Sequence, residues 1–233
     1  MYPDVHRLCR DYAIAPQRAE IVVETAPADI VFERETSRRM NAARCRAVPE
    51  PADGYLETLA VYRRLVQALL QYDVLLFHGS CVAVDGEGYL FIAPSGTGKS
   101  THTRLWREML GARAVMVNDD KPLLHVSERG VTVYGTPWNG KHRLSQNIAA
   151  PLRAVCVLQR APENRIAPIP GVEAFSYLVR QSYRYENEAD ERRALALLDL
   201  LTQQVGLYRL GCDQTPAAAE TAWQAMRPGD ADA

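Results

Sequence analysis

The sequence predicts an α/β domain around a mixed, partly antiparallel central sheet that carries a phosphate-binding loop. Two observations lead to this fold class. The apolar segment 89–92 runs into a glycine-rich loop and then into a helical pattern over 101–110, the strand–loop–helix order typical of α/β proteins. Directly before it, the apolar run 81–84 is followed by Asp85 and Gly86, a pair typical of a tight hairpin turn. We therefore expect the strand that feeds the loop to have an antiparallel partner.

Length and composition set the domain organisation and the compartment. With 233 residues, the chain is long enough for one sizeable domain, expected at 51–233, and a small strand-containing appendage at 1–50. The formal net charge of −1 gives no reason to expect nucleic acid or a membrane surface as a partner. The five cysteines are scattered and form no CxxC pair, and no apolar run reaches the ~20 residues of a membrane span. Because nothing at the N-terminus resembles a signal peptide, we expect a cytoplasmic protein with reduced thiols.

The N-terminal region has few clear signals. The segments 20–24 and 29–33 are predicted as two short strands joined across Pro27. The segment 34–46 is basic, and we interpret it as a solvated edge or loop, or alternatively as a contact surface for an acidic partner. Its arginines are Arg34, Arg38, Arg39, Arg44 and Arg46.

The main domain has a regular alternation of elements. Apolar residues at three- and four-residue steps predict an amphipathic helix over 54–72, whose apolar stripe packs in the core. Further strands are predicted at 74–77, 114–117, 131–134, 152–158 and 207–210, a polar turn at 159–164, and helices at 172–183, 188–205 and 216–227.

The loop after the strand 89–92 has the pattern of a phosphate-binding loop, with Ala93 in place of the usual first glycine. Gly96 and Gly98 allow positive-φ turns that bring backbone N–H groups close to an anion. Lys99 can reach the β- and γ-phosphates of ATP, and the Ser100 hydroxyl can bind Mg²⁺. The alternative is a glycine-rich turn with a chance Lys-Ser pair. The predicted nucleotide-binding residues are Ser95, Gly96, Thr97, Gly98, Lys99, Ser100 and Thr101.

Two adjacent acids end the strand 114–117, at the edge of an open α/β sheet where ligands bind. Mg²⁺ takes hard oxygen ligands, so one acid is expected to hold the metal together with Ser100. Neighbouring side chains on a strand point to opposite faces, so the two acids are expected to have different roles. We assign Asp119 as the general base and Asp120 as the metal ligand, and the reverse order stays open. The alternative is a pair of loop acids with no chemical role.

His78 ends a predicted strand beside the hairpin that feeds the loop. Its charge is easily set near neutral pH, so it could steady the γ-phosphate or orient an acid, and it joins Asp119 and Lys99 as a candidate catalytic residue. A hydrogen-bonded structural histidine is the alternative.

The segment 135–141 is a second shaped loop, with two glycines and a proline. Trp138 could stack on a planar ligand, while Lys141 and Arg143 could meet anionic oxygens of a substrate. A turn with a packed tryptophan is the alternative. Arg160 is a weaker candidate of the same kind.

The stretch 78–120 resembles the HPr kinase/phosphorylase-like kinases, a group related to ATP-dependent phosphoenolpyruvate (PEP) carboxykinases. The resemblance rests on the order and spacing of His78-Gly79, the hairpin, the loop 95–100 and Asp119-Asp120. The rest of the chain resembles a small carboxykinase-like subgroup, marked by the loop 135–141, that includes tailoring kinases for ribosomal peptides. This resemblance implies the fold of the HPr kinase C-terminal domain and of PEP carboxykinase, with functional roles for His78, Lys99, Ser100 and Asp119.

The chain also departs from these relatives. It lacks the later Arg-Asn signature associated with phosphorylase activity and HPr binding, and its N-terminal segment is smaller than that of an HPr kinase. We therefore expect an ATP- and Mg²⁺-dependent kinase that acts on a hydroxyl of a small molecule or peptide. The resemblance also implies a homo-oligomer. The alternatives are a nucleotide-binding regulatory module that contacts a partner through its N-terminal region, and a carboxykinase-type lyase, for whose additional ligands the chain has no room.

Overall fold

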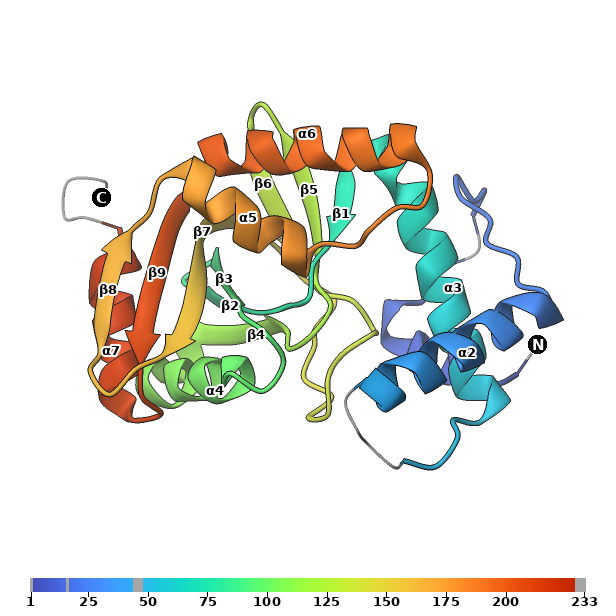
Figure 1. Cartoon of the computed structure of the whole chain (residues 1–233), viewed down its shortest axis with the longest axis horizontal. Helices are drawn as coiled ribbons and strands as arrows, with labels where there is room; N and C mark the ends of the chain where they lie inside the picture. Colours follow the sequence, from blue (N-terminus) through green and yellow to red (C-terminus); the bar gives the residue numbers. More distant parts are fainter. Residues whose placement is uncertain (1, 16, 44–47, 229–233) are drawn as a thin grey trace. The chain divides into compact units, whose positions relative to one another are not determined.

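The computed structural model describes residues 2–15, 17–43 and 48–228. Within it, the chain divides into two compact units, Met1–Leu69 and Leu70–Ala233 (Figure 1). Arg44 and Arg46 of the basic segment, together with Cys45, lie outside the described residues.

The first unit consists of helices. Its elements are α1 (Asp4–Leu8), η1 (Arg10–Tyr12), α2 (Pro27–Ala43) and α3 (Asp53–Leu69). The prediction of strands at 20–24 and 29–33 is wrong, because 20–24 has no regular structure and 29–33 lies in α2. Proline is well tolerated in the first turn of a helix, and Pro27 opens this one. Residues 34–43 continue the same helix, so the expectation of an edge or loop there is also wrong, whereas Arg38 and Arg39 are exposed as expected for a solvated segment.

Side chains one helical turn apart explain why α2 is a helix. Asp29 and Glu33 are both buried against α3. The Arg63 side chain donates to Glu33 at 2.6 Å and to Asp29 at 2.8 Å, and Arg64 Nε donates to Asp29 at 3.0 Å. Asp29 also accepts from the backbone N–H of Ala26 at 3.0 Å, which satisfies a free donor at the start of the helix. The contacts with Arg63 and Arg64 join residues at least 30 positions apart, so the local pattern did not reveal them.

The second unit is a mixed α/β domain. Its strands are β1 (Val74–Leu76), β2 (Gly79–Val84), β3 (Glu87–Ile92), β4 (Ala114–Asn118), β5 (Leu123–Ser127), β6 (Gly130–Tyr134), β7 (Ala149–Arg160), β8 (Arg165–Pro168) and β9 (Gly206–Cys212). Its helices are η2 (Leu70–Tyr72), α4 (Lys99–Leu110), η3 (Gly111–Arg113), α5 (Gly171–Gln181), α6 (Glu188–Gln204) and α7 (Pro216–Met226). The predicted elements of this unit are confirmed, with ends shifted by a few residues. The predicted helix 54–72 corresponds to α3 and η2.

The hairpin prediction is confirmed. β2 and β3 pair antiparallel, and the turn residues Asp85 and Gly86 have φ values of 52° and 90°. Two successive positive φ values match the right-handed twist of the flanking strands. β2 also pairs antiparallel with β4, so β3 and β4 run in the same direction.

The long strand β7 organises the sheet. Its first residues pair antiparallel with β6, and its remainder pairs parallel with β3 on one side and with β9 on the other. The strand order is β1-β5-β6-β7-β3-β2-β4, with β9 also beside β7 and β8 beside β9. As a result, the carboxyl ends of β3, β4, β7 and β9 meet at one edge of a curled mixed sheet (Figure 1). Ligands of open α/β folds bind at such an edge.

Helices cover this sheet and complete its core. α4 and α7 pack together against β2, β4 and β9, while α5 and α6 pack together against the region of β3, β5 and β6 (Figure 1). Trp106 of α4 is fully buried and lies 5.1 Å, between ring centroids, from both Tyr89 and Phe91 of β3. This aromatic packing fixes α4 on the sheet.

The sequence analysis did not predict two strands, β5 and β8. β5 shows alternating burial, with Leu124 and Val126 inside, but it is short and pairs with β1 and β6. β8 pairs with β9 and lies at an edge of the sheet among the strands that the structure describes. Within the described residues, no helix is long and apolar enough to cross a membrane.

Candidate functional site

The loop 93–98 connects β3 to α4 at the shared sheet edge. Gly96 and Gly98 have φ values of 83° and 126°, as the sequence predicted. A Cβ added to either glycine would meet nothing within 4 Å, so these positions need glycine for the backbone conformation rather than for space. α4 begins at Lys99, and the backbone N–H groups of its first turn are available to an anion.

Lys99 directly follows this loop, as the first residue of α4, and is only 8% exposed. Its Nζ donates to the backbone carbonyl of Ala93 at 2.8 Å, across the loop. Burial lowers the pKa of Lys99, and the negative charge of Asp120 partly opposes this shift. The ammonium group therefore lies within the electrostatic field of the Asp120 carboxylate.

His78 and Asp120 form a pair at the same edge. His78 Nε2 and Asp120 Oδ1 are 3.3 Å apart, and the Gly79 backbone N–H donates to the Asp120 carbonyl at 3.0 Å. Burial acts to raise the pKa of Asp120, but His78, Lys121 and Lys99 outweigh it, and the pKa is lowered. Asp120 is therefore ionised at neutral pH.

Gln181, at the end of α5, orients His78 and was missed by the sequence analysis. The amide orientation that suits its surroundings places the side-chain nitrogen 3.3 Å from His78 Nδ1 and 3.2 Å from the Ala93 carbonyl. His78 Nδ1 then accepts a hydrogen bond, so Nε2 carries the proton that faces Asp120. The backbone reinforces the contact, since the His78 N–H donates to the Gln181 carbonyl at 2.7 Å. A glutamine that ends a helix carries no local signal for such a role.

Asp119 occupies a different environment from Asp120. It is 4% exposed, and its Oδ1 accepts from the Gly140 backbone N–H at 2.6 Å. Its Oδ2 is buried and has no hydrogen-bond partner among the residues that the structure describes. Burial raises the pKa of Asp119 despite the hydrogen bond from Gly140. The two neighbouring acids therefore have pKa values displaced in opposite directions.

Asn118 holds the two sides of this edge together, and the sequence analysis gave it no role. Its side chain is fully buried at the end of β4. The amide nitrogen donates to the carbonyls of Thr136 at 3.0 Å and Trp138 at 3.1 Å, which anchors the loop 135–141. The amide oxygen accepts from the N–H groups of Asp120 at 2.8 Å and Lys121 at 2.6 Å. One side chain thus fixes both the acid pair and the loop beside it.

The loop 135–141 has a buried part and an exposed part. Trp138 is only 7% exposed, which agrees with the alternative of a packed tryptophan. Lys141 and Arg143 are exposed and come within three positions after Gly140, the residue that contacts Asp119. The structure therefore places two cationic side chains in the chain segment next to the Asp119 carboxylate.

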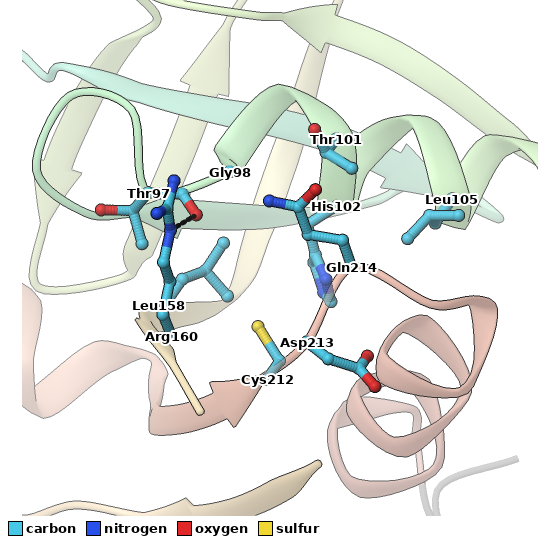
Figure 2. Close-up of a pocket in the computed structure, with 10 residues that line it drawn as sticks. All are labelled: Thr97, Gly98, Thr101, His102, Leu105, Leu158, Arg160, Cys212, Asp213 and Gln214. Atoms are coloured by element: carbon cyan, nitrogen blue, oxygen red, sulfur yellow. Dashed lines mark hydrogen bonds between the residues drawn. The ribbon is translucent and has the colours of Figure 1, made fainter. Parts of the chain in front are cut away.

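Arg160 reaches the glycine loop from the end of β7. Its side chain donates to the carbonyl of Gly96 at 2.6 Å. It also donates to the carbonyl of Thr97 at 3.4 Å (Figure 2). Arg160 therefore contacts the loop 93–98, whereas the sequence predicted it as a substrate-binding residue together with Lys141 and Arg143.

A family model described as "SynChlorMet cassette protein ScmC" matches residues 56–193, more than half of the chain. The chain belongs to the ScmC family. The matched region contains His78, Lys99, the Asp119-Asp120 pair, Arg160 and Gln181.

The other comparisons add little to this assignment. A search of curated protein sequences finds no match. Among solved structures, the ScmC-family chain is similar to the Hpr(Ser) kinase/phosphatase from Coxiella burnetii, with 12% sequence identity and a TM-score of 0.36. That match covers 65% of this chain and 95% of the other.

The ScmC-family chain has oxygen ligands that fit Mg²⁺ if a nucleotide supplies the others. In the part of the chain that the structure describes, no group of three or more His, Cys, Asp or Glu side chains could hold a metal ion. Mg²⁺ needs no such group where phosphates and water complete its shell, and one or two protein oxygens suffice. Asp120 supplies an ionised carboxylate, and Ser100, in the first turn of α4, supplies a half-buried hydroxyl. These two residues could therefore hold the metal.

Proposed function

We propose that this ScmC-family protein is an ATP- and Mg²⁺-dependent kinase that transfers the γ-phosphoryl group to a hydroxyl of a small molecule or peptide. The observation that supports this proposal is the convergence of Lys99, the His78–Asp120 pair and Asp119 at one sheet edge. Phosphoryl transfer requires clamped phosphates, neutralised charge and a positioned acceptor, and little covalent chemistry from the protein. Each of these tasks has a candidate residue at this edge.

The loop 93–98 and the start of α4 would bind the phosphates through backbone N–H groups. Lys99 would leave the Ala93 carbonyl and turn toward the β- and γ-phosphates. Asp120 and Ser100 would hold Mg²⁺, which neutralises charge on the phosphates when bound. His78 would hold the Asp120 carboxylate in place through its Nε2 proton, with Gln181 behind it.

Asp119 would accept the proton of the attacking hydroxyl. A general base works best when its pKa approaches the working pH, and burial shifts Asp119 in that direction. Its Oδ2 makes no hydrogen bond within the described structure, so it can receive the proton without losing a partner. The reverse assignment would require Asp120 to act as base with a lowered pKa, which is why we favour Asp119.

The exposed cations Lys141 and Arg143 would contact the acceptor. Lys141 follows Gly140, whose N–H holds the proposed base, and Arg143 comes two positions later, so an acceptor bound to them would lie close to Asp119. Cationic side chains favour an acceptor that carries its own anionic group.

The deciding experiment follows γ-phosphate from labelled ATP and Mg²⁺ into the small-molecule and the macromolecular fractions of a cell extract. Lys99→Ala provides the blank. We expect label in one fraction with the wild-type protein and none with the variant, and the labelled fraction identifies the acceptor class. Label in neither fraction, while ATP still binds, would overturn the kinase and favour the regulatory module. Formation of ATP and oxaloacetate from phosphoenolpyruvate, carbon dioxide and ADP in a coupled assay would favour the lyase.

A further inference from the structure

We infer that the nucleoside of the bound nucleotide lies over a hollow on the β7–β9 side of the loop, between Arg160 and Gln214. This inference rests on the proposed function, because it assumes that the loop 93–98 binds a nucleoside triphosphate. It adds a subsite that the sequence analysis could not place, since no base-binding residue was identifiable there.

Sheet topology gives the direction of the nucleotide. Across the edge, the strands follow the order β4-β2-β3-β7-β9, and the loop 93–98 follows the central strand β3. His78 precedes β2 and Asp120 follows β4, so both lie on one side of the loop. Arg160 ends β7 and Gln214 follows β9, on the other side. A triphosphate chain whose γ end faces Asp120 must therefore direct its nucleoside toward β7 and β9.

A hollow is present at that place. It lies beside the first turn of α4, between the loop and the end of β9 (Figure 2). Thr97, Gly98 and Thr101 line it from the loop and helix, and Arg160, Asp213 and Gln214 from the ends of β7 and β9. Leu158 adds an apolar residue to the lining. Loop residues that are expected to bind phosphate thus share this hollow with residues from two other strands.

The volume of the hollow, about 20 Å³, fits a water molecule and not a nucleobase. The base must therefore lie across the rim, where the side chains are exposed and can adjust. Arg160 is exposed and already contacts the loop carbonyls of Gly96 and Thr97. A guanidinium group is planar and stacks on aromatic faces, so Arg160 suits the flat face of a base.

The two remaining polar groups on the rim have different roles. Asp213 is already used within the fold, because it accepts from the Thr215 N–H at 2.9 Å and from Asn164 at 3.1 Å. Gln214 is exposed, and its amide offers both donors and an acceptor to the edge of a base. We therefore assign Arg160 to the face of the base and Gln214 to its edge.

The test compares the affinities of Mg-ATP and Mg-tripolyphosphate, which carries the phosphates without the nucleoside. Binding is measured by calorimetry for the wild type, Arg160→Ala, Gln214→Ala and Arg165→Ala. Arg165 is an exposed arginine on β8 that does not line the hollow, so it serves as the matched control. Far-UV circular dichroism checks that each variant is folded.

We expect wild-type protein to bind ATP more tightly than tripolyphosphate. Arg160→Ala should reduce this preference by about three- to thirtyfold, the range expected for one cationic stacking contact. Gln214→Ala should reduce it by a smaller factor, and Arg165→Ala should leave it unchanged.

Three results would overturn the inference in different ways. Equal wild-type affinity for both ligands would mean that no nucleoside subsite exists, while the phosphate loop would stand. A second contrary result is that Arg160→Ala weakens ATP and tripolyphosphate binding by the same factor while Gln214→Ala changes neither affinity. Arg160 would then stabilise the loop and would not contact the nucleoside. If the wild-type protein binds neither ATP nor tripolyphosphate, the result would contradict the proposed function itself.

Discussion

Asp119 and Asp120 are adjacent in the chain, but their surroundings shift their pKa values in opposite directions. Burial raises the pKa of the first, and contacts with His78, Lys121 and Lys99 lower that of the second. Pairs of acids whose surroundings displace their pKa values in opposite directions are a frequent basis for separate roles as base and as charged ligand. The structural source of the difference is the burial of Asp119, which the Gly140 N–H does not offset, and the contacts of Asp120 with His78 and the two lysines, which outweigh its burial.

Replacing the proposed base should separate catalysis from binding. Asp119→Asn keeps the size of the side chain and removes its ability to accept a proton, so we expect kcat to fall by about 10²- to 10⁴-fold. ATP affinity should change little, because the proposal assigns phosphate binding to the loop 93–98, Lys99 and Ser100 and not to Asp119. Steady-state kinetics and calorimetry measure the two quantities, and the exposed acid Glu128→Gln is the control. Unchanged kcat would exclude Asp119 as the base.

Asn118 offers a second prediction at this scale. Asn118→Ala should lower the free energy of unfolding by about 2 kcal/mol, because buried backbone groups lose their partners. Urea denaturation, monitored by tryptophan fluorescence, measures this loss of stability. The variant should also lower kcat, since the acid pair and the loop 135–141 lose their common anchor. A variant with wild-type stability would contradict the role assigned to Asn118.

At the scale of elements, the contact between the acidic first turns of α2 and the helix α3 explains why the strand predicted at 29–33 is a helix. Residues 29–33 contain three apolar side chains in a row, a pattern typical of a strand. Two of these, Val31 and Phe32, are exposed, whereas Asp29 and Glu33 are buried. The ion pairs with Arg63 and Arg64 therefore determine which face of α2 packs inward.

These ion pairs predict how the stability of the helical unit depends on pH. Burial acts to raise the pKa of Asp29, but hydrogen bonds from Ala26, Arg63 and Arg64 outweigh it and lower the pKa to about 2. A lowered carboxyl pKa stabilises the fold above the unfolded value of about 3.8, and this stabilisation disappears as the pH falls toward about 2. We expect the ionised Asp29 to contribute about 2 kcal/mol at neutral pH.

Asp29→Asn tests this contribution. The difference in free energy of unfolding between wild type and variant should be largest above pH 5 and should shrink as the pH falls below 4. Urea titrations at several pH values, followed by circular dichroism, measure it. A difference that stays constant between pH 5 and pH 3 would mean that Asp29 acts by packing and not by charge.

At the scale of the whole molecule, the division into two units predicts two unfolding transitions. All three tryptophans, Trp106, Trp138 and Trp223, belong to the unit Leu70–Ala233, so their fluorescence reports on that unit alone. Circular dichroism reports on the helices of both units. Asp29→Asn should therefore shift a transition seen by circular dichroism and leave the fluorescence transition unchanged. A common shift in both signals would mean that the units unfold together.

The sequence by itself determined the centre of the mixed α/β domain. The Asp85-Gly86 hairpin, the positive-φ glycines at 96 and 98, the helix that follows them and the end of β4 at the acid pair were all predictable. Each depends on residues within a few positions of one another: a turn dipeptide, a glycine that permits positive φ, or an apolar periodicity. The roles assigned to these residues stay predictions until phosphate transfer is measured.

Only the tertiary structure decided the features that join distant segments. The helical state of 29–33 depends on Arg63 and Arg64, and the short strands β5 and β8 exist because neighbouring strands supply their hydrogen bonds. Gln181 behind His78 and Arg160 beside the glycine loop reach the site from far along the chain. The physical reason is the same in each case. A buried charge, a strand edge or a polar side chain takes its conformation from the partner that satisfies it, and the fold determines which partner that is.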